Sequence, residues 1–374
     1  MRTSTRDPGR SPYVGREEAV RLDVHAHEFP ERYLREINRL IARGKFPRVA
    51  EPLLPWRLDQ QLAHMEATGI DVMVLALASA TYLADRRLAR ELARLANEAF
   101  VEAAKKYPDK FRVFCFVPLG HVGDAIAELQ HCVEDLGCHG LILGTNVRGR
   151  PLNHPGFLPF FEVVNRMRMP VLLHPMDPGW PESLHEFRLD LWIGWPFETT
   201  LAVARMVLSG LFDRFPDFPL ILSHLGGNIP QMVERINMAS GRGRAEKPPL
   251  EYFKRFYYDT AGPVPPEAVR CAAAMFGVDR IVFGTDYPFG PGRGRAFGEK
   301  AVACVEGLPV GPQEKAKVYG GTAWGLLERR EWHASHGMAP PPRGKTLDRR
   351  RQMSRTTSPP EGQGQFPGRK ASEE

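Results

Sequence analysis

The sequence predicts an α/β protein of the (β/α)8 TIM-barrel class, with an insertion after the first strand and a disordered C-terminal tail. Short apolar or β-branched runs recur over about 300 residues, and each leads into a stretch with helical periodicity. Eight such strand–helix units are the number that closes a barrel. A doubly wound open sheet is the weaker alternative, because it usually has a glycine-rich phosphate loop where this chain has Val24-His25-Ala26-His27.

Proline and glycine mark most junctions between the expected elements, so each element can be bounded in chain order. The expected strands are Val20–His27, Asp71–Leu77, Arg112–Leu119, Gly140–Gly144, Pro170–His174, Pro219–His224, Phe256–Thr260 and Arg280–Asp286. The expected helices include Leu58–Ala67, Arg86–Lys106, Asp124–Leu136, Phe157–Arg168, Thr199–Phe212, Pro230–Ala239, Glu267–Phe276 and Gln313–Leu327. The long segment Glu28–Trp56 reads as an insertion over the mouth of the barrel.

The chain divides into an N-terminal extension (1–19), a barrel domain (20–330) and a basic tail (331–374). Of the net charge of +6, the stretch from Arg329 to Glu374 carries +5, with ten Lys or Arg against five Asp or Glu. This stretch is rich in Pro, Gly, Ser and Gln and cannot bury enough apolar surface to fold, so we expect it to be disordered. The charge therefore predicts no nucleic-acid partner.

The cellular location can be narrowed from what the sequence lacks. It contains no uncharged apolar run of the length that spans a membrane, and its first 20 residues contain no apolar signal region. Its five cysteines are scattered, with no Cys-x-x-Cys pair. We expect a cytoplasmic protein without a membrane partner.

Metal-ligating residue types fall at the ends of four expected strands. His25 and His27 end the first strand, His174 the fifth, His224 the sixth and Asp286 the eighth. Residues i and i+2 of a strand point to the same side, so both first-strand imidazoles can face one ion. The carboxyl ends of barrel strands form the rim where such enzymes hold their active sites. The pattern predicts one divalent ion, Zn²⁺ by preference, with Mn²⁺ or Fe²⁺ as alternatives.

Each of these residues alone has an ordinary structural explanation. His174 can be a core histidine, and Asp286 can cap a turn through its own backbone. Their coincidence at separate strand ends is what predicts a site. The remaining histidines lie in expected helices, loops or the tail and are expected to be structural.

Several blocks resemble the amidohydrolase superfamily, and most closely its aminocarboxymuconate-semialdehyde decarboxylase-like branch. The signature blocks are Asp23-Val24-His25-Ala26-His27, Leu173-His174-Pro175, Ser223-His224-Leu225-Gly226-Gly227 and Phe283-Gly284-Thr285-Asp286-Tyr287-Pro288. Further likeness lies in Glu128 to Gly144, Gly194 to Thr200 and Phe256 to Thr260, so the resemblance runs from about Arg21 to Leu327.

The resemblance implies roles for particular residues. His25, His27, His174 and Asp286 would bind one divalent ion, usually zinc. His224 would sit beside the metal-bound water as the acid/base residue. Arg235 matches an arginine that reaches a substrate carboxylate across a homodimer interface.

Two departures bear on the branch and the substrate. Two-metal amidohydrolases need a bridging ligand at the end of strand four, often a carboxylated lysine, but there is no lysine between Lys110 and Lys247. A mononuclear site follows. The related decarboxylase has a substrate-binding arginine where this sequence has Gln61, with Arg57 about one turn earlier on the same helix face. Either Arg57 binds the substrate in its place or this second carboxylate contact is missing.

The expected function is a metal-dependent, non-oxidative decarboxylase of an unsaturated or aromatic carboxylic acid, with His224 and Asp286 in proton transfer. A hydrolase of a lactone, amide or ester, using the same site, is the alternative, and a catalytically inactive binding scaffold is a third. Trp180, Trp195 and Phe289 are candidate walls for a flat ligand, although aromatic residues also serve packing.

Overall fold

The computed structural model describes residues 20–43, 55–77, 82 and 85–327. The predicted N-terminal extension and disordered basic tail lie outside these residues. Among the residues described, no helix combines the length and apolarity needed to cross a lipid bilayer.

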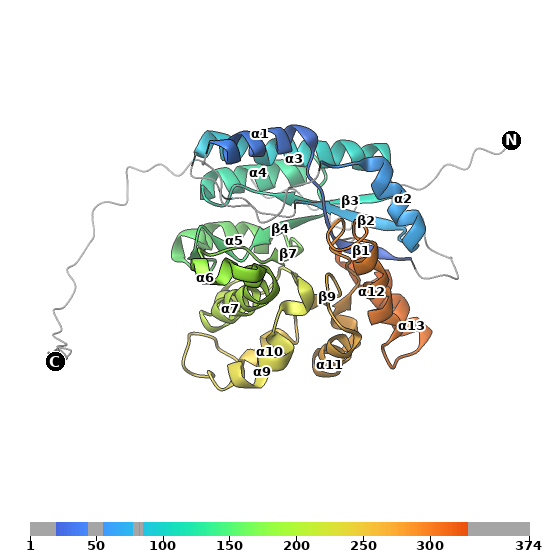
Figure 1. Ribbon diagram of the computed structural model, residues 1–374. Coiled ribbons are helices and arrows are strands. Elements are labelled where there is room, and N and C mark those ends of the chain that lie inside the picture. The colour runs from blue at the N-terminus through green and yellow to red at the C-terminus, as the bar shows by residue number, and fades with distance from the viewer. Residues whose placement is uncertain (1–19, 44–54, 78–81, 83–84, 328–374) are drawn as a thin grey trace, which may run out of the picture. The chain divides into compact units, whose positions relative to one another are not determined.

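Eight parallel strands of the described chain form one sheet in the order β1-β2-β3-β4-β7-β8-β9-β10, which confirms the predicted fold class (Figure 1). Their side chains are buried almost throughout, as expected for strands covered on both faces. The bounds are Leu22–His27 (β1), Val72–Ala76 (β2), Phe111–Phe116 (β3), Gly140–Gly144 (β4), Val171–His174 (β7), Leu220–Leu222 (β8), Tyr257–Asp259 (β9) and Ile281–Val282 (β10).

The sheet closes between its first and last strands. The backbone N–H of Val24 donates to the carbonyl of Phe283 at 3.1 Å, and that of Asp286 donates to the carbonyl of His25 at 2.8 Å. Ala26 also forms a parallel bridge with Tyr287. Strands separated by most of the chain therefore lie side by side and complete the barrel.

Helices surround the sheet (Figure 1). Apolar residues at helical spacing bury one face of each longer helix; in α3 these include Ala89, Leu92, Ala96 and Phe100, and the Asp85 side chain caps its first turn. The bounds are Glu31–Ala42 (α1), Leu58–Thr68 (α2), Arg86–Lys106 (α3), Val122–Glu134 (α4), Leu158–Arg166 (α5), Glu182–His185 (α6), Trp195–Leu208 (α7), Leu211–Arg214 (α8), Ile229–Asn237 (α9), Pro249–Phe253 (α10), Pro266–Phe276 (α11), Arg295–Glu306 (α12) and Pro312–Ala316 (α13).

Five strands end earlier than the sequence predicts, and the early ends of β8 and β10 place two predicted site residues in turns. β8 stops at Leu222 because His224 and Leu225 both adopt left-handed backbone angles, with φ of 51° and 59°. β10 stops at Val282, and Asp286 has a φ of 68°. His224 and Asp286 therefore lie in turns just beyond their strands. Strands cannot continue through this conformation, which is uncommon outside glycine.

Three connections differ from expectation. The single helix expected over 199–212 is divided into α7 and α8 by Gly210, whose φ is 75°. An additional helix, α12, follows the last strand, and the expected helix over 313–327 is present beyond it as α13, the π-helical segment Lys317–Gly321 and a helical stretch over 322–327. An unpredicted hairpin follows β4, made by β5 (Asn146–Val147) and β6 (Arg150–Pro151).

The predicted insertion is described in part. It contains α1, which packs against α3 of the outer helix layer through a buried face that includes Tyr33 and Ile37. Its residues 44–54 lie outside the described part of the chain.

Candidate metal centre

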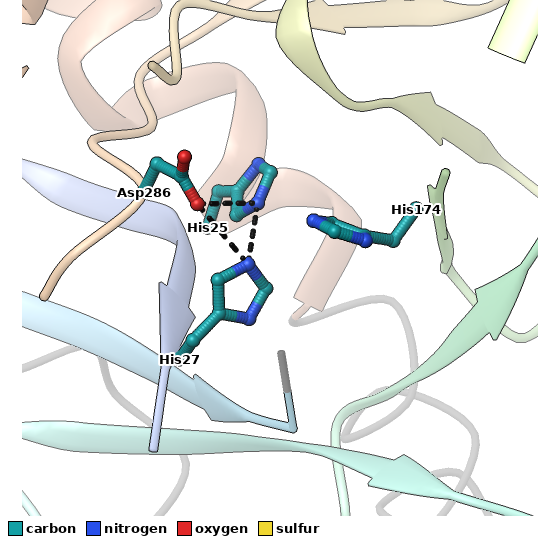
Figure 2. Close-up of side chains that lie close together, drawn as sticks. All are labelled: His25, His27, His174 and Asp286. Carbon is teal, nitrogen blue, oxygen red and sulfur yellow. Dashed lines mark hydrogen bonds and ion pairs between the residues drawn. The ribbon is translucent and has the colours of Figure 1, made fainter. Parts of the chain in front are cut away.

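Four side chains from three parts of the barrel converge on one point. His25 and His27 come from the end of β1, His174 from the end of β7 and Asp286 from the turn after β10 (Figure 2). One ligand-type atom from each lies within 4.8 Å of the others. All four residues are buried, and Asp286 is the most exposed of them at 8%. The structure thus brings together the four residues that the sequence predicts as metal ligands.

The distances inside this His/Asp centre suit a bound cation. The Nε2 atoms of His25 and His27 are 2.8 Å apart. Asp286 Oδ1 lies 3.2 Å from His27 Nε2 and 3.5 Å from His25 Nε2. Two imidazole nitrogens this close repel through their lone pairs unless a proton or a cation lies between them. The residues therefore fit a divalent ion, for which imidazole and carboxylate are ordinary ligands.

Hydrogen bonds on the far side of two rings fix which nitrogen faces the centre. Asp259 Oδ2 is 2.6 Å from His25 Nδ1, and the Pro175 carbonyl is 3.1 Å from His174 Nδ1. Each oxygen accepts from an Nδ1–H, which leaves the Nε2 lone pair directed at the centre. Sequence reasoning did not name Asp259 as a site residue, although it ends β9 at the same rim as the predicted ligands.

Burial and neighbouring charges hold most of the centre in the protonation states that a cation requires. Burial lowers the pKa of His27 to about 4. Burial and the adjacent imidazoles lower the pKa of His174. Burial alone would raise the pKa of Asp286, but the surrounding histidines outweigh it and hold that pKa well below its usual range. Two neutral imidazoles and one carboxylate result near pH 7.

His25 differs from the other two histidines. Burial opposes its charged form, but the Asp259 carboxylate outweighs burial and raises the pKa of His25. A cation at the centre would take the place of this proton.

A buried carboxylate behind the centre joins β1 to the turn that follows β10. Asp23 accepts hydrogen bonds from the His25 N–H at 2.9 Å and from the Thr285 hydroxyl at 2.5 Å. It also accepts from the Thr285 N–H at 3.1 Å. Asp23 therefore sets the position of β1 relative to the turn that carries Asp286. Burial raises the pKa of Asp23 to about 7.

His224 lies beside the four residues without being one of them. Its Nε2 is 3.6 Å from Asp286 Oδ2, and its ring is 5.0 Å from that of His25. Its side chain is 14% exposed, against 0% for His25. This position can reach both the centre and a molecule bound at the rim.

Two of the predicted aromatic walls contact the centre. The Trp195 ring lies 5.6 Å from that of His174, and the Phe289 ring lies 5.7 Å from that of His27. Trp180 instead lines a small cavity of about 100 Å³ with residues that include Thr145, Glu198 and Arg205.

The two predicted substrate-binding arginines are exposed. Arg57 precedes α2, pairs with Asp59 at 3.2 Å, and has a side chain that is 55% exposed. Gln61 is buried and accepts a hydrogen bond from Trp56. Arg235 lies on the exposed face of α9. Neither arginine is among the side chains that this single chain gathers at the centre.

Met176 packs closely against the end of β4, where a two-metal site would carry its bridging lysine. A Cβ placed on Gly144 would lie 2.4 Å from Met176 Cγ. The next residue, Thr145, accepts a hydrogen bond from the Met176 N–H at 3.0 Å. The close packing of Met176 fills the space that a longer side chain would need.

The chain matches known proteins over most of its length. A family model described as Amidohydrolase matches residues 22–329. The "Gamma-resorcylate decarboxylase" of Rhizobium sp. is 36% identical over 251 residues, which are 62% of this chain and 76% of the relative. The "2-amino-3-carboxymuconate-6-semialdehyde decarboxylase" of Dictyostelium discoideum is 26% identical over 72% of this chain and 82% of its own.

A solved structure shares the fold. A dihydroxybenzoic acid decarboxylase from Polaromonas sp. JS666, with bound manganese and the inhibitor 2-nitroresorcinol, superposes with a TM-score of 0.70. It is 25% identical and covers 83% of this chain and 97% of its own.

Proposed function

The chain belongs to the amidohydrolase family, and on that premise we propose that it is a metal-dependent, non-oxidative decarboxylase of an aromatic carboxylic acid. The observation that carries the proposal is the convergence of His25, His27, His174 and Asp286 within 4.8 Å. The names of the relatives support the reaction, and that of the Rhizobium enzyme supports a hydroxylated aromatic acid as the substrate class.

These four residues would hold one divalent cation. When bound, the cation supplies Lewis acidity that polarises a substrate oxygen, an effect worth several kcal/mol. Zn²⁺ is the ion that the sequence resemblance implies, and the manganese of the Polaromonas structure supports testing Mn²⁺ beside it. The packing of Met176 against Gly144 supports a single ion.

His224 would donate a proton to the ring carbon that carries the carboxylate. That carbon becomes tetrahedral, its bond to the carboxylate breaks, and the electron pair returns to the ring as CO₂ leaves. One proton is taken up and one CO₂ is released. Asp286, whose Oδ2 lies 3.6 Å from His224 Nε2, would orient the imidazole and shuttle the proton.

Aromatic contacts and a carboxylate-binding arginine would position the substrate. Trp195 and Phe289 would lie against its flat faces, and Trp180 and Arg57 remain weaker candidates because neither is shown to contact the centre. Arg235 would bind the substrate carboxylate held by a second copy of the chain.

The proposed homodimer has a suitable surface. Ile193, Phe197 and Leu201 recur every fourth residue and are 47%, 49% and 48% exposed. Just beyond the end of α9, which carries Arg235, the Met238 side chain is 80% exposed. An exposed apolar stripe of this kind favours burial against a partner. None of the five cysteines, all of which the structure describes, is in a disulfide, and this supports the cytoplasmic location that we propose.

The hydrolase alternative would use the same residues, but the relatives named above are decarboxylases. The inactive scaffold is disfavoured because all four ligand-type side chains are present and converge. Neither alternative is therefore retained.

The test is a screen of the enzyme, loaded separately with Zn²⁺ and Mn²⁺, against hydroxybenzoic and muconic acids, with CO₂ release as the readout. We expect release from a dihydroxybenzoate, lost on chelation and restored by the ion. Parallel assays with aromatic lactones and esters follow hydrolysis. Hydrolysis in those assays without any CO₂ release would contradict the proposal.

A further inference from the structure

Three cysteine thiols meet outside the His/Asp centre. Cys115 lies in β3, Cys132 in α4 and Cys138 in the segment between α4 and β4. Their Sγ atoms lie within 4.8 Å of one another, and the residues are 0%, 0% and 2% exposed. We propose that this cysteine cluster is a second, structural metal site that takes one soft, thiophilic ion of the class to which Zn²⁺ and Cu⁺ belong.

The geometry is close to what such an ion needs. With metal–sulfur bonds of about 2.3 Å, three sulfurs around one ion lie about 4 Å apart. The thiols would therefore move by less than about 1 Å. Backbone bonds already hold the cysteine-bearing segments: the Cys138 N–H donates to the Cys132 carbonyl at 2.8 Å, and the His139 N–H donates to the Val113 carbonyl at 2.8 Å. Little chain entropy remains to be lost on binding.

Polar groups around the cluster would stabilise thiolates. The Asn97 side-chain amide lies 3.2 Å from Cys132 Sγ and 3.0 Å from Glu128 Oε1. Arg94 holds the Glu128 carboxylate with two of its nitrogens, the shorter contact being 2.7 Å. The amide donor favours the negative charge that a metal–thiolate site carries, and the guanidinium offsets the Glu128 carboxylate, which would otherwise oppose that charge.

A fourth buried cysteine shows what ordinary packing looks like in this protein. Cys304 is 0% exposed, and its thiol donates to the Val264 carbonyl at 3.3 Å. Buried cysteines commonly behave as such isolated small apolar residues. Apolar packing alone does not require three sulfurs to face one another beside an amide donor, and this arrangement distinguishes the cysteine cluster from Cys304.

Binding of a divalent ion to the cysteine cluster would release three protons. Three S–H bonds release their protons and three sulfur–metal bonds form, so a dication and three thiols give a complex of charge −1 and three protons. The Glu128 carboxylate, 3.6 Å from Cys132 Sγ, can accept the first proton on its way to solvent. Because the thiols are sealed from water, the ion would enter during folding or during transient opening of α4.

The test uses Cd²⁺ as a thiophilic probe on protein whose His/Asp centre is already loaded with Mn²⁺. Wild type, Cys132→Ser and the matched buried control Cys304→Ser are equilibrated with Cd²⁺ at a temperature that permits local opening. Only thiolate ligands give the near-ultraviolet sulfur-to-cadmium charge-transfer band, so any Cd²⁺ at the His/Asp centre does not contribute to it.

We expect wild type and Cys304→Ser to bind one Cd²⁺ with this band and to release three protons. Cys132→Ser should bind at least a hundredfold more weakly. The Tm of wild type should also rise with Cd²⁺, and that of Cys132→Ser should not. If Cys132→Ser fails to fold, Cys138→Ser replaces it. No band in wild type, an equal band in the serine variant, or a disulfide within the cluster of the purified protein would overturn the proposal.

Discussion

The His/Asp centre and the cysteine cluster are both buried groups of metal-ligating side chains, yet their surroundings differ. The His/Asp centre lies beyond the carboxyl ends of the strands and borders His224, whose side chain is 14% exposed. The cysteine cluster lies between β3 and α4, where Cys115 and Cys132 are 0% exposed. The first has a face that a substrate can reach, and the second has none.

Because of this difference, the His/Asp centre is suited to catalysis and the cysteine cluster to a structural role. An ion at the barrel rim can contact a bound molecule, because barrel enzymes bind their substrates at this face. An ion enclosed by three thiols beneath a helix can only hold elements together. The comparison predicts large effects on turnover from changes at the rim and small effects from changes under α4.

The largest expected effect is that of His174→Ala. Removal of one imidazole from the four-residue set should abolish both metal retention and CO₂ release, because the remaining three residues no longer enclose the ion. The measurements are metal content after dialysis and kcat. His131→Ala, on α4 where His131 pairs with Asp135, is the control and should retain both. If the His174→Ala enzyme retained both its metal and its activity, His174 would not be a metal ligand and the proposed metal centre would be wrong.

The next largest effect should come from His224→Ala. Because His224 lies beside the four residues and is not one of them, this variant should retain the ion. Its kcat should fall by about 10²–10⁴-fold, the usual contribution of a general acid or base. Loss of the ion from this variant would show that its assigned role is wrong.

Asp259→Asn should have a smaller effect that acts through His25. An amide can no longer hold the Nδ1–H of His25 as a carboxylate does, so metal affinity should fall by about 10–100-fold. Saturating metal should restore most of kcat, an outcome that separates positioning from catalysis. Asp279→Asn, at an exposed pair with Lys317, is the matched control. A kcat that stayed low with the metal site saturated would contradict a positioning role.

Arg235→Ala tests the proposed second copy of the chain. KM for the acid should rise about tenfold while metal content stays unchanged, since the loss of one charged hydrogen bond costs about 1.5–3 kcal/mol at most. Arg57→Ala, which removes an exposed pair with Asp59, should change KM less than twofold. Equal effects of the two variants would remove the distinction between these arginines.

The smallest expected effect on turnover is that of Cys132→Ser. With the His/Asp centre saturated by Mn²⁺, its kcat at 25 °C should lie within twofold of wild type, even where Tm falls. If folded Cys132→Ser lost as much turnover as His224→Ala, the cysteine cluster would have a part in catalysis. That result would contradict the purely structural role proposed for it.

Sequence spacing predicted those features that barrel topology dictates. The alternation of strands and helices located all eight strands, and the rim position of strand ends brought together His25, His27, His174 and Asp286. The left-handed turns at His224 and Asp286 were not predicted, because residues other than glycine seldom adopt them and no local pattern marks them.

Contacts between distant segments were also beyond sequence reasoning. Asp259 reaches His25 across 234 positions, and only the closed barrel makes them neighbours. The meeting of Cys115, Cys132 and Cys138 depends on how α4 packs over β3, which the scattered spacing of the cysteines conceals. A single chain likewise gives no site contact for Arg235, whose proposed role needs a second copy.

The backbone bond from Asp286 to His25 has a consequence for assembly of the enzyme. It lies where the first and last strands pair and close the barrel. A nascent chain therefore forms the complete metal centre only after its last strand has been translated. A cation bound there would link the first strand to the turn after the last one. Its binding free energy would offset part of the entropy lost in closing a loop of more than 250 residues. Loading of this ion should accordingly be a late event, coincident with completion of the fold.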